Sequence, residues 1–306
     1  MESANRRAED GGRSRRLRKG MYVLPSLFTT ANLAAGFYAI TQAALGAAHA
    51  GGILPSATGV DPLRSAAIYF NHSAVAIGFA VVFDGFDGAI ARLTHTTSDF
   101  GKELDSLADV VAFGVAPAIL AWLWGFFCLP FSLDSDLRAK LIEWGAIIAF
   151  AYLTAGACRL ARFNIQLNPQ PKNPGHPNRK YFVGMPIPAG AGCLAAFVHF
   201  RMGYPVQAWW SCIVWMVYIF LCAFLMVSTW RFWSAKSIDF RNRQASRLFV
   251  LFAPILAAIW YYHRYVLFVI TLVYMLTGVF FRLTYAFRRG KSAPPPTPPQ
   301  PVVAAS

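Results

Sequence analysis

Six of the 14 acidic residues lie within 26 consecutive positions, which begin at Asp84 and end at Asp109. Four of them stand in otherwise apolar sequence at the spacing of a helix face. Asp84 and Asp87 are three residues apart, and Asp105 and Asp109 are four apart. A short loop, residues 92–102, joins the two segments, so we expect two antiparallel helices whose carboxylates face each other. Hard oxygen ligands in this number suit two Mg²⁺ or Mn²⁺ ions.

Two such ions about 4 Å apart clamp the attacking and leaving oxygens of a phosphoryl displacement. Gly88 and Ala91 share a helix face with the first acid pair and leave room for a ligand. Arg92 and Lys102 add positive charge near a diphosphate. The pattern predicts phosphoryl-type transfer. Acids inside a membrane also form proton or cation pathways in transporters, and the spacing leaves that alternative open.

The composition indicates which elements must position these acids. The 306 residues are 56% apolar, and Asp, Glu, Lys and Arg make up only 14%, too few to cover a water-soluble protein of this size. Lipid leaves no partner for free backbone groups, so we expect an all-α integral membrane protein. Apolar stretches that cross or nearly cross the ~30 Å hydrocarbon core are residues 22–45, 66–86, 103–127, 142–163, 182–200, 207–230, 248–262 and 265–287.

The basic residues predict the orientation. With a cytoplasmic N-terminus, 23 of the 28 Lys and Arg fall on the cytoplasmic side and five on the other. We therefore expect both termini and the acid cluster to be cytoplasmic, in a bacterial inner membrane. Residues 1–21 form a basic tail, which anionic lipid would attract, so we expect no nucleic-acid partner.

The segment from Asp84 to Asp109 resembles the signature of the CDP-alcohol phosphatidyltransferase family, D-x-x-D-G-x-x-A-R-x8-G-x3-D-x3-D. All eight specified residues are present at the specified spacing. The resemblance implies a six-helix membrane core with two divalent cations, and a homodimer. It also implies displacement of CMP from a CDP-linked lipid or alcohol by a hydroxyl acceptor. The six-helix core corresponds to a catalytic membrane domain at 22–230. Outside the resemblance, the sequence itself predicts a basic loop at 231–247, a pair of transmembrane helices at 248–287 and a Pro-rich disordered tail at 288–306.

Three further stretches are similar to the serine-using members of that family. They are residues 24–36, 103–117, and 159–164 followed by 182–188. This similarity implies CDP-diacylglycerol and L-serine as substrates, with the lipid substrate held in the bilayer. Another acceptor, such as glycerol 3-phosphate, inositol phosphate or choline, would keep the same core, and it stays an alternative.

The resemblance also implies the roles of individual residues. Asp109 is the general base for the serine hydroxyl, and Asp105 is its catalytic neighbour. The metal ligands are Asp84, Asp87, Asp105 and Asp109, and the residues around the CDP moiety are Gly88, Ala91, Arg92, Ser98 and Gly101.

Serine must be recognised through its charged groups. Arg159 and Arg162 stand near the cytoplasmic end of the fourth span, and either can hold a carboxylate in a bidentate pair. Asn164 and Asn32 can add hydrogen bonds. Arginine is also expected at a cytoplasmic helix end for topological reasons alone, so both interpretations stay open.

Overall fold

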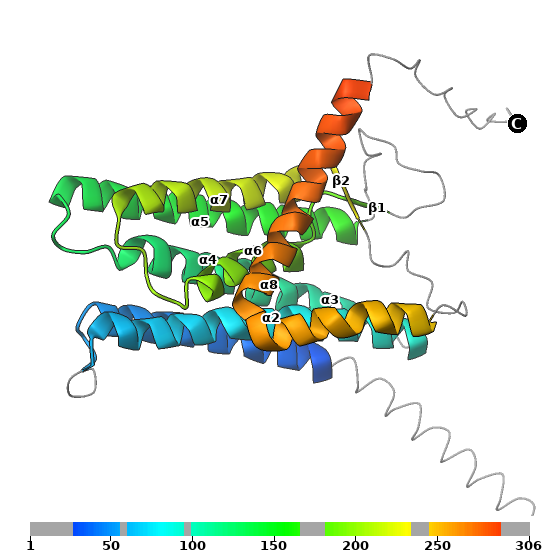
Figure 1. Ribbon diagram of the computed structural model, residues 1–306, viewed down its shortest axis with the longest axis horizontal. Helices are drawn as coiled ribbons and strands as arrows, with labels where there is room; N and C mark the ends of the chain where they lie inside the picture. Colours follow the sequence, from blue (N-terminus) through cyan, green and yellow to red (C-terminus); the bar gives the residue numbers. More distant parts are fainter. Residues whose placement is uncertain (1–26, 56–59, 95–98, 166–180, 234–244, 289–306) are drawn as a thin grey trace, which may run out of the picture.

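The computed structural model describes residues 27–55, 60–94, 99–165, 181–233 and 245–288. In these ranges the chain is almost entirely helical, and most of its long helices run roughly along one common direction (Figure 1). The first helix covers residues 27–50. The later helices are α2 (Pro62–Thr94), α3 (Asp99–Asp109), α4 (Ala116–Trp122), α5 (Ser135–Asn164), α6 (Ile187–Phe200), α7 (Trp209–Val227) and α8 (Ala245–Arg288).

Two π-helical segments interrupt the third predicted span without breaking it. They are η1 (Val110–Val115) and η2 (Leu123–Phe127), and with α3 and α4 they form one continuous helix. Extra backbone residues of this kind widen a helical turn and are frequent at functional sites. Here η1 begins at the residue after Asp109.

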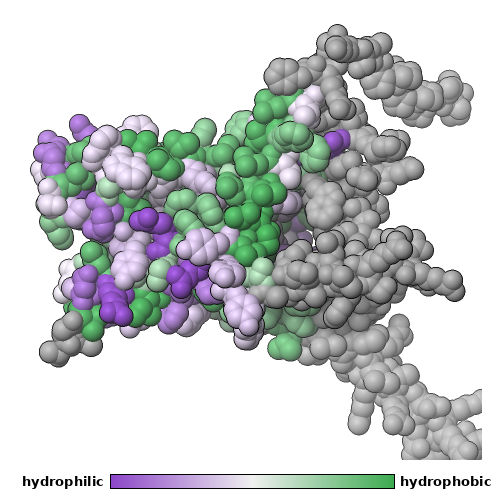
Figure 2. All heavy atoms as spheres, in the orientation of Figure 1, coloured by the Kyte–Doolittle hydropathy of each residue, from purple (hydrophilic) through white to green (hydrophobic). Residues whose placement is uncertain are grey.

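The all-α membrane fold is confirmed. Among the described residues, five helical stretches are long and apolar enough to cross a membrane. Hydrophilic residues gather toward the end where α2 and α5 begin, and the second half of α8 presents a mostly hydrophobic surface (Figure 2). The five stretches are Pro62–Phe86, Phe100–Phe127, Ser135–Asn164, Trp209–Val227 and Trp260–Thr284.

The first helix packs closely against η1 and α2. A Cβ at Gly36 would lie 2.8 Å from Cα of Ala112, so the two backbones touch where the absence of a side chain permits it. Ser73 of α2 donates a 2.7 Å hydrogen bond to the carbonyl oxygen of Ala39. These contacts hold the first helix against the two helices that carry Asp84 and Asp109.

The fifth predicted span, residues 182–200, is helical only from Ile187. Before it, β1 (Tyr181–Val183) pairs antiparallel with β2 (Arg231–Trp233). Gly184 then turns the chain with φ 76°, a conformation that favours glycine. The apolar run predicted one long helix because hydropathy does not distinguish a strand end from a helix start.

The short helix α6 lies at the centre of the bundle. It packs against α2 and α8, and nine of its 14 residues are buried. Beside it, Phe197 stands 4.9 Å from the ring of Trp215 and 6.0 Å from that of Trp124. This aromatic core packs α6 against η2 and α7.

The last two predicted spans are two helices that meet at a kink at Tyr262 (φ −126°, ψ 33°), and together they carry the label α8. The predicted boundary at His263 and Arg264 directly follows this kink. The two halves of α8 run in clearly different directions (Figure 1).

Candidate active site

Three of the four predicted carboxylates converge. Asp84 comes from α2, and Asp105 and Asp109 come one turn apart from α3. One carboxylate oxygen from each lies within 4.8 Å of those from the other two. Asp109 is buried, whereas Asp84 and Asp105 are half-buried. Like charges at this distance repel, and a bound cation removes that repulsion, so the three carboxylates can hold a divalent metal ion.

Asn32 of the first helix contacts this cluster from the side. Its side chain is only 2% exposed, and its amide Nδ2 donates a long hydrogen bond of 3.4 Å to Oδ1 of Asp109. Its own Oδ1 is buried and accepts no hydrogen bond from the described residues. An unsatisfied buried acceptor costs about 1–3 kcal/mol. A cation or a donor on a substrate would satisfy this oxygen, and its position therefore fits a site for such a ligand.

Arg159 supplies positive charge near the cluster. This α5 side chain is buried, and it interacts electrostatically with Asp109, Asp84 and Tyr274. Its guanidinium carbon lies 5.3 Å from the ring centre of Phe163. A buried guanidinium beside carboxylates is suited to orient an anionic group brought in by a substrate.

Arg162, one turn later, has different partners. Its guanidinium donates to the carbonyl oxygens of Met226 and Val227, at 3.2 and 3.3 Å. These carbonyls end α7, where a cation is also favoured by the helix dipole. Arg162 therefore joins the ends of α5 and α7.

Of the remaining predicted site residues, the structure describes the side chains of some and not of others. Asn164 Nδ2 donates a 2.8 Å hydrogen bond to Ser106 Oγ, which donates in turn to the carbonyl oxygen of Lys102. This link ties the end of α5 to α3. Gly101 lies half-buried in the first turn of α3. Asp87, Gly88, Ala91 and Arg92 lie in α2 with side chains outside the described part, and Ser98 lies outside the described residues.

Two features of the site were not predicted. Asn32 was expected only as a possible contact to serine, and its bond to Asp109 joins residues 77 positions apart. Tyr274 reaches the surroundings of Arg159 from α8, which the predictions placed outside the catalytic unit. Two signals pointed to Asn32: it is a polar side chain inside an apolar stretch, and it lies in residues 24–36, which resemble the serine-using members of the family. Nothing in the sequence pointed to Tyr274.

The chain is similar to known proteins over most of its length. A family model described as CDP-alcohol phosphatidyltransferase matches residues 22–210. A Helicobacter pylori protein named CDP-diacylglycerol–serine O-phosphatidyltransferase is 29% identical over 283 residues, which are 89% of this chain and 98% of the relative. A protein of the same name from Bacillus subtilis is 40% identical over 129 residues, 42% of this chain and 61% of the relative. Another, from Methanocaldococcus jannaschii, is 40% identical over 132 residues, 43% of this chain and 53% of the relative.

Proposed function

Since the chain belongs to the CDP-alcohol phosphatidyltransferase family, we propose that it transfers the phosphatidyl group of CDP-diacylglycerol to the hydroxyl of L-serine. The products are phosphatidylserine and CMP. The convergence of Asp84, Asp105 and Asp109 carries this proposal, because these are three of the four acids of the family signature. The names of the similar proteins support serine as the acceptor.

We propose two divalent cations, Mg²⁺ or Mn²⁺, held by Asp84, Asp87, Asp105 and Asp109. The oxygen-only donor set and the buried acceptor on Asn32 support a hard cation. When bound, the ions supply neutralising charge for the diphosphate and for the departing CMP. The CDP moiety would lie against Gly88, Ala91, Arg92, Ser98 and Gly101.

The residues of the chain account for the proton and for orientation. Asp109 accepts the proton of the serine hydroxyl while that oxygen bonds to the phosphorus attached to diacylglycerol, and the bond from this phosphorus to CMP breaks. Asn32 fixes the orientation of the Asp109 carboxylate through its hydrogen bond. Burial of Asp109 keeps bulk water from competing for the same proton position.

Arg159 is our preferred partner for the serine carboxylate, because it is buried and interacts electrostatically with Asp109 and Asp84. Arg162 is less suited, since its guanidinium already binds the end of α7. Asn164 stands at the edge of the site, where its bond to Ser106 orients it beside α3.

The protein is a multi-pass membrane protein. We propose that its active site and both termini face the cytoplasm of a bacterium, on the evidence of the 23-to-5 division of basic residues. Soluble serine would enter from that side, and CDP-diacylglycerol would enter from the bilayer. We also propose a homodimer, as the family resemblance implies.

CMP release by the purified chain tests the function. We expect release with CDP-diacylglycerol and serine, and none when glycerol 3-phosphate, inositol phosphate or choline replaces serine. Asp105→Asn and Asp109→Asn should each abolish release. Glu103→Gln is the matched control, because Glu103 is an exposed acid on the same helix and should keep full activity.

Other outcomes would redirect the assignment. Release with a different acceptor would keep the chemistry and change the substrate. Ion flux through liposomes without CMP under any acceptor would indicate a transporter. Full activity of either Asp variant would remove the carboxylate cluster from the reaction.

A further inference from the structure

A second candidate site lies near the start of α2, at the end of this helix opposite Asp84. A cavity of ≈ 520 Å³ is lined by residues of α2, of the end of α6 with its following turn, and of the α8 kink. Its outer residue Arg64 precedes Asp84 by about 20 positions on one continuous helix, or ~30 Å along the axis. The hydrocarbon core is also ~30 Å thick. The Arg64 end of the cavity therefore lies at the membrane interface opposite the carboxylate cluster.

The lining of this cavity is cationic. Arg64 of α2 and Arg264 of α8 both face it, and none of its described lining residues is acidic. Within the described part of the chain, neither guanidinium forms an ion pair. The nearby Asp61 instead accepts a hydrogen bond from the backbone of Leu63, at 3.0 Å, where α2 begins. Two of the five basic residues predicted for this side of the membrane thus line one cavity.

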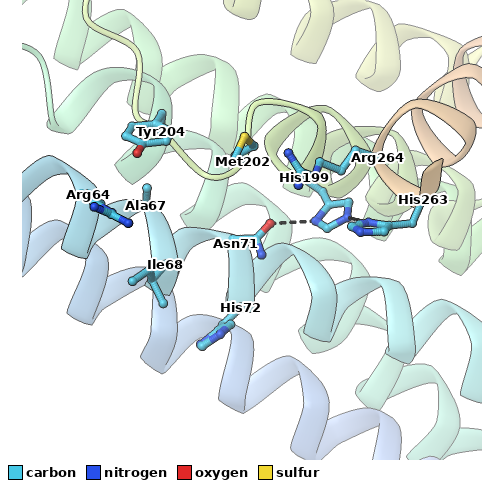
Figure 3. Close-up of a pocket in the computed structure, with 10 residues that line it drawn as sticks. All are labelled: Arg64, Ala67, Ile68, Asn71, His72, His199, Met202, Tyr204, His263 and Arg264. Atoms are coloured by element: carbon cyan, nitrogen blue, oxygen red, sulfur yellow. Dashed lines mark hydrogen bonds between the residues drawn. The ribbon is translucent and has the colours of Figure 1, made fainter. Parts of the chain in front are cut away.

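A hydrogen-bonded row of side chains crosses the same cavity (Figure 3). His199 Nδ1 lies 2.7 Å from Asn71 Oδ1, and His199 Nε2 lies 2.7 Å from His263 Nδ1. The amide oxygen can only accept, so His199 Nδ1 carries a proton and donates it. This bond turns the oxygen of Asn71 toward His199, and it leaves the amide N–H₂ group as a donor for a ligand. The row also joins α2, α6 and α8, which makes the cavity a preformed site.

We propose that this cavity binds a phosphate anion, supplied either by the headgroup of a phospholipid or by free phosphate. Guanidinium and amide N–H groups are the donors that phosphate oxygens prefer, and the absence of a lining carboxylate removes competing repulsion. The volume lies within the range of small-molecule sites. Exposed Ile68 and Met202 border the cations, and they suit the carbon atoms that follow a lipid phosphate. The site is separate from the transfer reaction.

Calorimetric titration of the purified, delipidated full-length chain in detergent tests this site. The two probes are short-chain phosphatidylglycerol and inorganic phosphate, in separate titrations. We expect binding, and we expect the Arg64→Gln/Arg264→Gln double variant to weaken it at least about tenfold, since two charge-assisted contacts are lost. Binding of the lipid alone supports a headgroup site, and equal binding of inorganic phosphate supports a site for the free anion.

Lys140→Gln is the control, because it removes a positive charge from the predicted same side, on exposed α5 surface outside the cavity. It should bind like the unmodified protein. The Arg64→Lys/Arg264→Lys variant should keep part of the affinity, because it retains both charges. Unchanged CMP release by the double Gln variant shows that it is folded. Absence of binding by the unmodified chain, or equal binding by the double Gln variant, would overturn the proposal.

Discussion

Replacing Asn32 by leucine separates the stability of the site from its activity. The side chain is 2% exposed, donates one 3.4 Å hydrogen bond to Asp109 and carries one buried unsatisfied oxygen. A hydrogen bond to a charged group contributes about 1.5–3 kcal/mol, and the long distance places this one at the low end. Removal of the unsatisfied oxygen raises the free energy of unfolding by about 1–3 kcal/mol. The two effects offset each other, so Asn32→Leu should unfold at the same temperature or slightly above it.

Activity should respond differently, because Asp109 loses the contact that orients it. A loss of about 1.4 kcal/mol in the transition state lowers kcat/KM about tenfold. The measurements are CMP release at varied serine concentration and thermal unfolding of the purified chain. Thr41→Val is the control, since Thr41 lies on the same helix and its hydroxyl donates to the carbonyl oxygen of Tyr38 within that helix. Full activity of Asn32→Leu would refute the positioning role of Asn32. An unfolding temperature several degrees lower would refute the claim that its buried Oδ1 is unsatisfied and destabilising.

Three further predictions follow from the same contacts. Arg159→Lys should raise the KM for serine about tenfold with little change in kcat, since it loses the bidentate contact; Arg162→Lys should leave KM unchanged and lower the unfolding midpoint. An unchanged KM in Arg159→Lys would remove that residue from the serine pocket. Gly36→Ala should destabilise the protein by about 1–3 kcal/mol, because the new methyl meets Ala112, whereas Gly78→Ala meets nothing within 4 Å and should be neutral or stabilising in thermal unfolding. Chelation of divalent cations should abolish CMP release, and Mg²⁺ or Mn²⁺ should restore it; activity that survives chelation would argue against the metal site.

The acid cluster was predictable because its geometry is local. Asp105 and Asp109 share a face by helical spacing alone, and the short connection after α2 brings Asp84 opposite them. The membrane fold followed from composition for a similar reason, since each apolar stretch must satisfy its own backbone hydrogen bonds.

Contacts between distant segments were not predictable. The bond from Asn32 to Asp109 depends on the close packing at Gly36, and hydropathy carries no information about which helices touch. The pairing of β1 with β2 joins segments about 50 residues apart. Because of this pairing, the helix predicted over residues 182–200 begins only at Ile187. The row from Asn71 through His199 to His263 likewise exists only because α2, α6 and α8 meet.

The shortness of α6 has a consequence for the membranes in which the protein can work. Its 14 residues rise only ~21 Å, well below the ~30 Å of hydrocarbon. Yet most of α6 is buried among other helices, so lipid does not contact it along its length. Hydrophobic matching is left to peripheral helices such as α7, whose 19 residues rise ~28 Å. Changes in bilayer thickness therefore act on the rim of the bundle, while the helix at its centre is shielded from them.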